Sequence, residues 1–191
     1  MKAEHQMENN EEIQVEQSSG KKRKAKKLPV AISEEEFTIL IKHTRKEHHK
    51  IAFLLGFGSG LRISEVLKLE SRHINFDAGT ILIEQGKGNK DRIVPLAKGF
   101  RLVHLKHLPI KCGERALEKA FKSCAKKAGL LETKPTLHFH SLRHGFATNC
   151  VANGIPIHHI RTMMGHSNIS TTNVYLEMNP KEALKSYREL F

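Results

Sequence analysis

The stretch TILIEQGKGNKDRIVPL, residues 80–96, decides the class of fold, because its pattern differs from the helical spacing on either side. Two runs rich in β-branched residues, TILIE (80–84) and RIVPL (92–96), flank the turn-forming GKGN, and this arrangement predicts a β-hairpin. Lys87 lies between two glycines of the turn, which permit positive φ angles and let a backbone approach a polyanion. The alternative is that Lys87 is an ordinary solvated turn lysine.

Apolar residues at helical spacing predict the remaining elements. Before the hairpin, Ser33 and Glu36 form a capping-box pattern that starts one helix; a second is expected at about 49–57, and a third begins around Arg62. After the hairpin, further helices are expected at about 114–128, 141–152, 156–164 with Pro156 in its first turn, around Tyr175, and from Pro180. The predicted fold class is therefore α+β, mostly α, with one small antiparallel sheet.

The net charge indicates a polyanionic partner. Of the formal charge of +12, residues 1–27 contribute only +2, so that the other 164 residues carry +10. A basic globular part of this kind most often binds nucleic acid, although a merely soluble basic protein is the alternative. Residues 1–27 are expected to be a disordered tail, in which KKRKAKK (21–27) fits a DNA-contacting arm, a nuclear localisation signal or a linker.

The composition argues against several classes of protein. No apolar run approaches the roughly 20 residues that cross a bilayer, and no signal peptide is recognisable, so we expect a cytoplasmic protein without membrane contact. Cys112, Cys124 and Cys150 follow no paired spacing, which argues against a disulfide framework. Neither zinc spacing with cysteine nor H-E-x-x-H occurs among the 13 histidines, and no metal or other cofactor is expected.

Two arginines are expected at helix starts. In HSLRHGFAT, His140 and Arg143 lie three residues apart, share a helical face and can address one anionic ligand at the helix N-terminus. A helix cap plus a surface arginine is the alternative. In GLRISE, Arg62 opens a helix and Glu65 could orient Arg62 or another site residue, unless the two form only an ordinary intrahelical ion pair.

GHSNISTTNVYLE, residues 165–177, contains Tyr175, one of only two tyrosines. Its phenol could fill a core or act as a reagent, whereas Tyr187 lies on an apolar helical face and is interpreted as packing. Together with His166 and the basic residues above, a phenol suits phosphodiester transfer. Guanidiniums hold phosphorus oxygens bidentately, a phenol with a pKa of about 10 needs a base and cationic surroundings, and lysine or histidine can protonate a departing alkoxide.

Four sequence boxes, taken in order, resemble the catalytic domain of the tyrosine recombinase family, the lambda-integrase and Xer type. The boxes are GLRISEVLKL, IEQGKGNKDRIVPL, HFHSLRHGFAT and MMGHSNISTTNVYLEMNP, and together they cover roughly residues 30–180. The resemblance implies the catalytic-domain fold of that family, with the small sheet or hairpin against a helical bundle. It also implies that Arg62 and Arg143 hold the non-bridging oxygens of the scissile phosphate and that His166 hydrogen-bonds this phosphate.

The same resemblance implies the roles of the reacting groups. Tyr175 would attack phosphorus and leave a 3′-phosphotyrosyl bond, His140 would act as acid and base near it, and Lys87 would reach the minor groove and protonate the leaving 5′ oxygen. Lys90 matches the family's glycine-flanked lysine less well than Lys87 does. Glu65 matches a supporting position, and neither ATP nor a metal is implied.

These matches predict a site-specific DNA recombinase or integrase. The expected organisation is a tail (1–27), a catalytic domain (28–180) and a C-terminal helix (181–191) for contact between protomers. Double-stranded DNA and a homo-oligomer, a tetramer on DNA, are the expected partners. The alternatives are a type IB topoisomerase-like nicking-closing enzyme and a DNA-binding regulator without catalysis.

Overall fold

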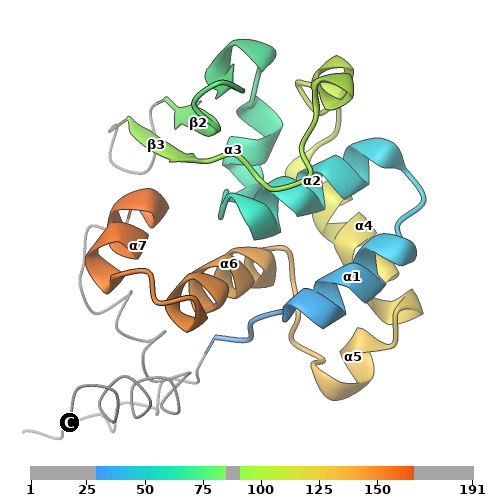
Figure 1. Cartoon of the computed structure of the whole chain (residues 1–191). Coiled ribbons are helices and arrows are strands. Elements are labelled where there is room, and N and C mark those ends of the chain that lie inside the picture. Colours follow the sequence, from blue (N-terminus) through green and yellow to red (C-terminus); the bar gives the residue numbers. More distant parts are fainter. Residues whose placement is uncertain (1–28, 85–90, 166–191) are drawn as a thin grey trace, which may run out of the picture.

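A computed structural model of the chain describes residues 29–84 and 91–165 (Figure 1). The elements in chain order are α1 (Glu34–Lys42), α2 (Glu47–Gly58), α3 (Ile63–Lys68), η1 (Ser71–His73), β1 (Ile74–Asn75), β2 (Thr80–Ile83), β3 (Arg92–Pro95), η2 (Leu102–His107), α4 (Glu114–Lys127), α5 (Leu130–Thr133), α6 (His140–Ala152) and α7 (Ile157–Met164). Within these ranges no helix has the length and apolar character to cross a membrane. The predicted fold class, mostly helical with a small antiparallel sheet, is confirmed.

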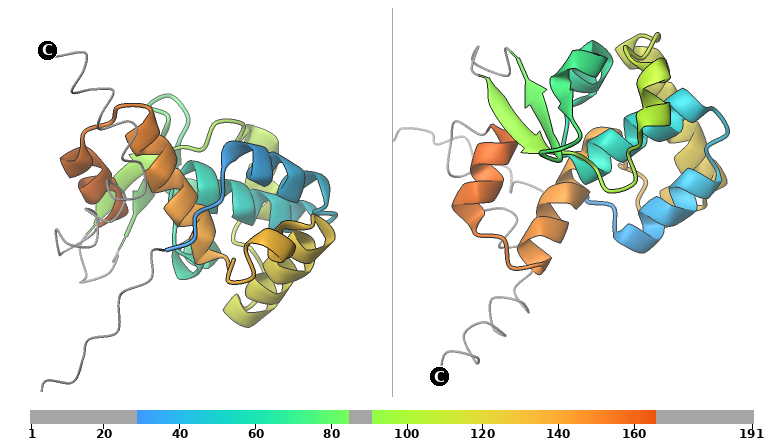
Figure 2. Two further views of the ribbon diagram at one scale, coloured as in Figure 1. Left: turned by 90° about the horizontal axis from the view of Figure 1, so that it is seen from below. Right: turned by 45° about the horizontal axis from the view of Figure 1, so that its top comes forward.

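The predicted β-hairpin forms two of the three strands of the sheet in the described residues. β2 and β3 pair antiparallel, with Ile83 opposite Arg92 at the end next to loop 85–90, and β1 adds a third strand alongside β2. Alternate side chains point inward: Val94 is buried, whereas its neighbour Ile93 is exposed. Because side chains alternate between the faces of a strand, Arg92 shares the inward face with Val94. Figures 1 and 2 show α7 lying beside β3.

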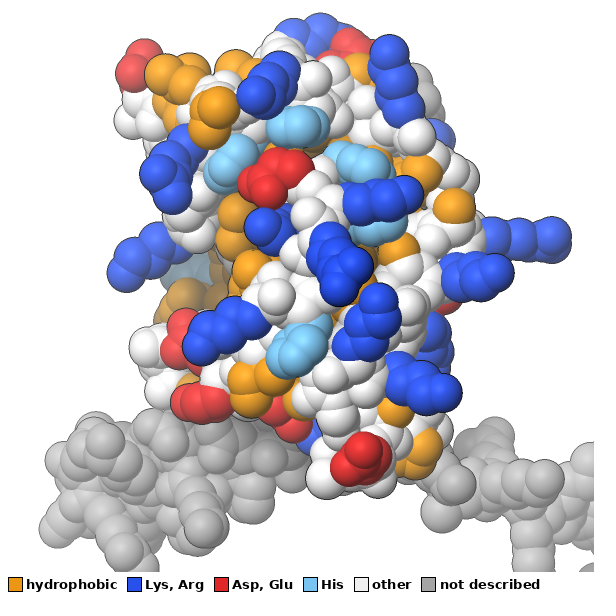
Figure 3. All heavy atoms as spheres, turned by 90° about the vertical axis from the view of Figure 1, so that its right-hand side faces the viewer, with side chains coloured by type: hydrophobic (Ala, Val, Ile, Leu, Met, Phe, Trp, Pro, Cys, Tyr) orange, Lys and Arg blue, Asp and Glu red, His pale blue; other side chains and the backbone are white. Residues whose placement is uncertain are grey.

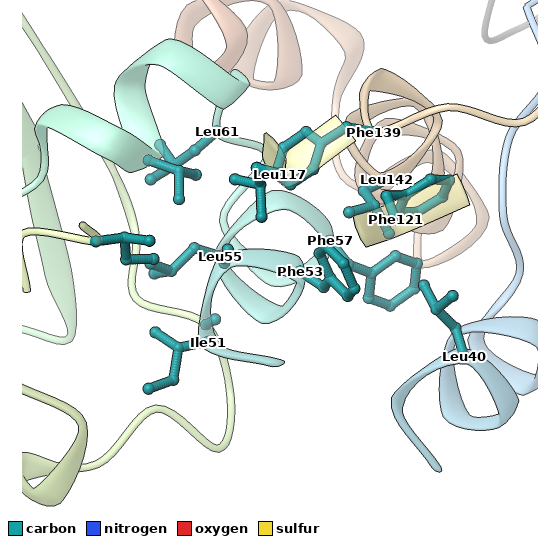
Figure 4. Packing of buried hydrophobic residues seen from close by; sticks show 14 of the residues in the cluster. Leu40, Ile51, Phe53, Leu55, Phe57, Leu61, Leu117, Phe121, Phe139 and Leu142 are labelled. Atoms are coloured by element: carbon teal, nitrogen blue, oxygen red, sulfur yellow. The ribbon is translucent and has the colours of Figure 1, made fainter. Parts of the chain in front are cut away.

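Helix α2 is central to the hydrophobic core, because it packs against α1, α3, α4 and α6. It is apolar around most of its circumference, as expected for a helix surrounded by others. The ring of Phe53 meets those of Phe121 and Phe139 edge-on, at centroid distances of 5.5 and 6.1 Å (Figure 4). At Gly56 an added Cβ would lie 3.1 Å from the Leu142 side chain, so this glycine lets α2 and α6 approach closely.

The boundaries differ from the sequence expectations in a few places. The second helix begins at Glu47 and runs to Gly58, and Pro156 is the N-cap of α7 rather than a residue of its first turn. The sequence predicted none of the short elements η1, β1, η2 and α5, which have two to six residues each and are too short to establish a period. The helices expected around Tyr175 and from Pro180, and the tail 1–27, lie outside the described residues.

Candidate active site

Side chains of three arginines from separate parts of the chain converge on the C-terminal end of α7. Arg62 is the N-cap of α3, Arg92 begins β3, and Arg143 lies in the first turn of α6. Arg62 Nη2 donates to the Met164 carbonyl at 3.3 Å, and Arg143 Nη2 donates to the same oxygen. Arg92 Nε donates to the carbonyl of Met163 at 2.8 Å. Guanidiniums at this position also interact favourably with the negative end of the helix dipole.

Arg143 is the most deeply buried of these side chains, since the residue is only 1% exposed. Its Nη1 donates to the Gly60 carbonyl at 2.6 Å. Gly60 has a φ of +67°, and a Cβ at this position would lie 2.5 Å from the Phe146 ring. A glycine is therefore needed to present this carbonyl to the guanidinium. The alternative interpretation of Arg143 as a surface arginine is wrong.

The Glu65 carboxylate holds the side chain and the backbone N–H of Arg62. Its Oε1 accepts a hydrogen bond from Arg62 Nη1 at 2.8 Å, and its Oε2 accepts one from the Arg62 backbone N–H at 2.8 Å. The expected intrahelical ion pair is present, but it is only part of the arrangement, because the carboxylate also binds Arg92. The Arg62 side chain is 20% exposed and lines a pocket of about 750 Å³ together with residues of η1 and β2, so the guanidinium can be reached from outside.

No motif in the sequence predicted a role for Arg92. Its Nη1 and Nη2 donate to Glu65 Oε1 and Oε2 at 2.9 and 2.8 Å. Its side chain is 7% exposed. One signal was available in the sequence: a charged residue in register with the apolar, inward-facing positions of a strand needs a buried partner of opposite charge.

The ionisation of Glu65 follows from these contacts. Burial raises the pKa of Glu65, but the hydrogen bonds from Arg92 and from the backbone and side chain of Arg62, with the charge of Arg92, bring this pKa down to about 2. The carboxylate is therefore charged at neutral pH, and the three guanidiniums outnumber it. This cluster has a net positive charge and suits an anionic ligand.

His140 lies at the edge of the same cluster, as the first residue of α6. Phe139 is the N-cap, so the alternative of a capping role for His140 is wrong. Burial lowers the pKa of His140 to about 4, and the charges of Arg143, His138 and Arg62 act in the same direction. The imidazole is therefore neutral at pH 7 and less basic than that of an exposed histidine. The charge of Arg143 thus acts on the His140 imidazole, and both residues lie at the start of α6.

The other expected site residues, Lys87, His166 and Tyr175, lie outside the described residues. The described chain resumes at Asp91 after loop 85–90 and ends at Gly165, which precedes His166 in the sequence. Within residues 29–84 and 91–165 no group of three or more His, Cys, Asp or Glu side chains is arranged to hold a metal ion.

Comparison with known proteins agrees with this arrangement. The sequence profile of the Phage integrase family matches residues 30–108 and 101–182. Tyrosine recombinase XerA of Thermococcus kodakarensis is 34% identical over 180 residues, which cover 83% of this chain and 62% of XerA. The crystal structure of a XerA recombinase is similar with a TM-score of 0.66 and 25% identity, over 87% of this chain and 65% of that one.

A third similar structure is that of the XerH site-specific recombinase bound to its palindromic difH substrate, in a post-cleavage complex. Its TM-score is 0.66 at 22% identity, over 84% of this chain and 53% of XerH, and this likeness concerns the fold. The chain thus spans less than two thirds of the length of these relatives. From the profile match, which extends over most of its length, the chain belongs to the phage integrase family, that of the tyrosine recombinases.

Proposed function

We propose that residues 28–180 form the catalytic domain of a site-specific DNA recombinase or integrase, which cleaves and rejoins DNA strands through a 3′-phosphotyrosyl intermediate. One observation carries the proposal: Arg62 and Arg143, which are 81 positions apart in the sequence, donate to a single carbonyl oxygen beside a neutral His140. Two guanidiniums that reach one oxygen atom are close enough to hold two oxygens of one phosphate. Membership of the phage integrase family supports the same reaction.

In the proposed reaction the arginines stabilise the charge that develops on phosphorus oxygens. Arg62 and Arg143 each donate to a non-bridging oxygen, and His166 donates a further hydrogen bond. The donors of Arg143 are held in advance by its burial and by the Gly60 carbonyl. Loss of one such pre-positioned donor typically raises the barrier by about 3 kcal/mol, by analogy with oxyanion holes.

The covalent step exchanges one phosphodiester for another. The Tyr175 phenol oxygen attacks phosphorus and forms the 3′-phosphotyrosyl bond, while the bond from phosphorus to the 5′ oxygen breaks. The phenol proton passes to the neutral imidazole of His140, and Lys87 protonates the departing 5′ oxygen. A 5′ hydroxyl from a second strand reverses these transfers, so the number of phosphodiester bonds is conserved and no ATP is consumed.

The partners in this proposal are double-stranded DNA and further copies of the chain. XerH was solved with a DNA substrate, and the excess of positive charge outside residues 1–27 supports the same partner here. A tetramer on DNA would bring together the strands to be exchanged, with residues 181–191 contacting a neighbouring protomer. Deletion of 181–191 should then impair assembly on DNA, and unimpaired assembly would contradict this part. A cytoplasmic, nucleoid-associated location follows from the substrate.

The test is a suicide-substrate assay with nicked duplexes that carry randomised sites. Wild type should form a denaturant-stable adduct mapped to a 3′ phosphate, Tyr175→Phe should form none while retaining DNA affinity, and Tyr187→Phe is the matched control. Supercoil relaxation without strand exchange would indicate the topoisomerase-like alternative. DNA binding without any adduct would indicate the regulator and would contradict the proposal.

A further inference from the structure

We propose that Arg92 is a positioning residue of the site, which fixes the orientation of Arg62 by holding the carboxylate that both arginines share. This inference rests on the proposed function for its catalytic consequence. The geometry from which it comes lies entirely within the described residues.

The Arg92 side chain is buried, and all three nitrogens of its guanidinium donate hydrogen bonds. Its Nη1 and Nη2 form two parallel hydrogen bonds to Glu65 at 2.9 and 2.8 Å, and its Nε donates to the Met163 carbonyl at 2.8 Å. The side chain also packs beneath Gly165, where a Cβ would lie 3.1 Å from Arg92 Cδ. A two-pronged arginine–carboxylate pair fixes direction as well as distance. Arg92 therefore sets the plane of the Glu65 carboxylate.

The same carboxylate orients Arg62. Oε1 accepts from Nη1 of both arginines, at 2.8 Å for Arg62 and 2.9 Å for Arg92, while Oε2 accepts from the Arg62 backbone N–H and from Arg92 Nη2. An ion pair three residues apart on one helix holds a long side chain only weakly. With Arg92 in place, Glu65 cannot rotate without breaking the fork, and the Arg62 guanidinium keeps one direction.

Arg92 also joins three segments that carry expected site residues. It lies opposite Ile83 where β2 and β3 flank loop 85–90, which contains Lys87 in the sequence. Through Glu65 it contacts α3 at Arg62, and through Met163 it contacts the end of α7, three residues before His166 in the sequence. The Arg92 side chain thus fixes the start of β3 relative to α3 and to the C-terminal end of α7.

The experiment compares Arg92→Lys with Arg115→Lys, a matched control at an exposed position of α4 that does not line the pocket of Arg62. Lysine keeps the charge but cannot make the fork and the Met163 hydrogen bond together. We expect the rate of adduct formation at saturating suicide DNA to fall at least about 10-fold in Arg92→Lys, with DNA affinity within about 2-fold of wild type. Arg115→Lys should match wild type. An unchanged rate, or losses of rate and affinity in equal proportion, would overturn the proposal.

A double-mutant cycle separates positioning from general stability. If Arg92 acts through Glu65, Arg92→Gln should slow the reaction in wild type but add no further loss to Glu65→Gln. Independent, multiplying losses would show that Arg92 does not act through Glu65. The Gln–Gln double variant removes both charges together, so it leaves no unpaired buried ion that could prevent folding.

NMR of the Arg62 side chain, which does not depend on catalysis, distinguishes failure of this inference from failure of the proposed function. In ¹⁵N-arginine-labelled, DNA-free protein, the Arg62 side-chain signals, assigned with Arg62→Lys, should show restricted rotation in wild type and free rotation in Arg92→Lys. Equal rotation in both would refute the inference even where the adduct forms. A rigid Arg62 in a wild type that forms no adduct would refute the proposed function alone.

Discussion

At the residue scale, the lowered pKa of His140 should make the free energy of unfolding depend on pH. Its pKa is lowered to about 4 in the fold, against an ordinary value of 6.5. The unfolded chain therefore binds more protons between these values, and the His140 contribution to the free energy of unfolding is present above about pH 6.5 and lost as the pH falls towards 4. Glu65, with a pKa of about 2 against 4.5, acts in a lower window.

His140→Gln should remove this dependence. Denaturant titrations at several pH values should show that wild type loses about 1–3 kcal/mol more than the variant between pH 7 and pH 4. His159→Gln, which changes an exposed histidine of α7, is the control and should follow wild type. Parallel curves for wild type and His140→Gln would mean that the imidazole is not held in its neutral form.

Local spacing predicted some site residues and missed another. His140 and Arg143 share a helix start, and Arg62 follows a glycine at the next one, so each carried a signal within a few residues. The only sequence signal for Arg92 was its inward-facing position in an alternating strand pattern, and its partner Glu65 lies 27 positions away in the sequence. A pairing between a strand and a helix depends on tertiary packing, which no local period records.

At the scale of elements, the turn between α2 and α3 is the feature most sensitive to substitution. Gly60 has a φ of +67° and would place a Cβ 2.5 Å from Phe146, whereas Gly79 has a φ of +62° and open space around it. Both alanine variants incur the cost of a left-handed residue, about 1–2 kcal/mol. Only Gly60→Ala adds a clash, and it also moves the carbonyl that Arg143 binds.

We therefore expect Gly60→Ala to lower the free energy of unfolding by about 2 kcal/mol more than Gly79→Ala does. Urea unfolding of the two variants measures this difference directly. Equal losses would show that the Phe146 ring moves aside freely and that the turn does not constrain the site.

Strong local patterns predicted the elements that form. Ser33 and Glu36 make the expected capping box, with the Glu36 carboxylate accepting from Ser33 N–H at 2.8 Å, and the hairpin has its predicted strands. The sequence does not show why position 56 is a glycine. Gly56 lies in the contact between α2 and α6, which are more than 80 residues apart. Local chemistry thus predicts where elements begin and end, but packing decides which faces meet.

At the scale of the whole molecule, positive charge gathers on one face. Figure 3 shows lysine and arginine side chains around several histidines on the side that faces right in Figure 1. The charges of Lys46 and His107 act on His48, and those of Glu47, Arg101 and His107 act on His104, with Glu47 acting in the opposite sense to the other two. We call Lys46, His48, Arg101, His104 and His107 the basic surface, in which the Glu47 carboxylate offsets part of the positive charge. Burial is the main cause that lowers the pKa of His48 and His104, so the charge at pH 7 comes mainly from lysine and arginine.

The basic surface is close in sequence to the pocket that Arg62 lines. Pro109, just after η2, lines the same pocket as Arg62. In the proposed complex, further phosphates of the duplex would lie on either side of the one held at Arg62, because duplex DNA carries a charge about every 1.7 Å along its axis. We therefore expect the basic surface to contact the DNA backbone beside the cleaved bond.

The salt dependence of binding tests this expectation, because each phosphate contact contributes about 0.9 to the slope of log K against log salt. Lys46→Gln/Arg101→Gln should reduce that slope by about 2 at pH 7.5, measured by fluorescence anisotropy with duplex DNA. Lys126→Gln/Lys127→Gln, which removes the same charge from exposed positions in the last turn of α4, should leave the slope unchanged. If both pairs reduce the slope equally, the whole charge of the molecule attracts DNA without a preferred face. If only the α4 pair does so, DNA lies across the last turn of α4, and the basic surface has no part in binding.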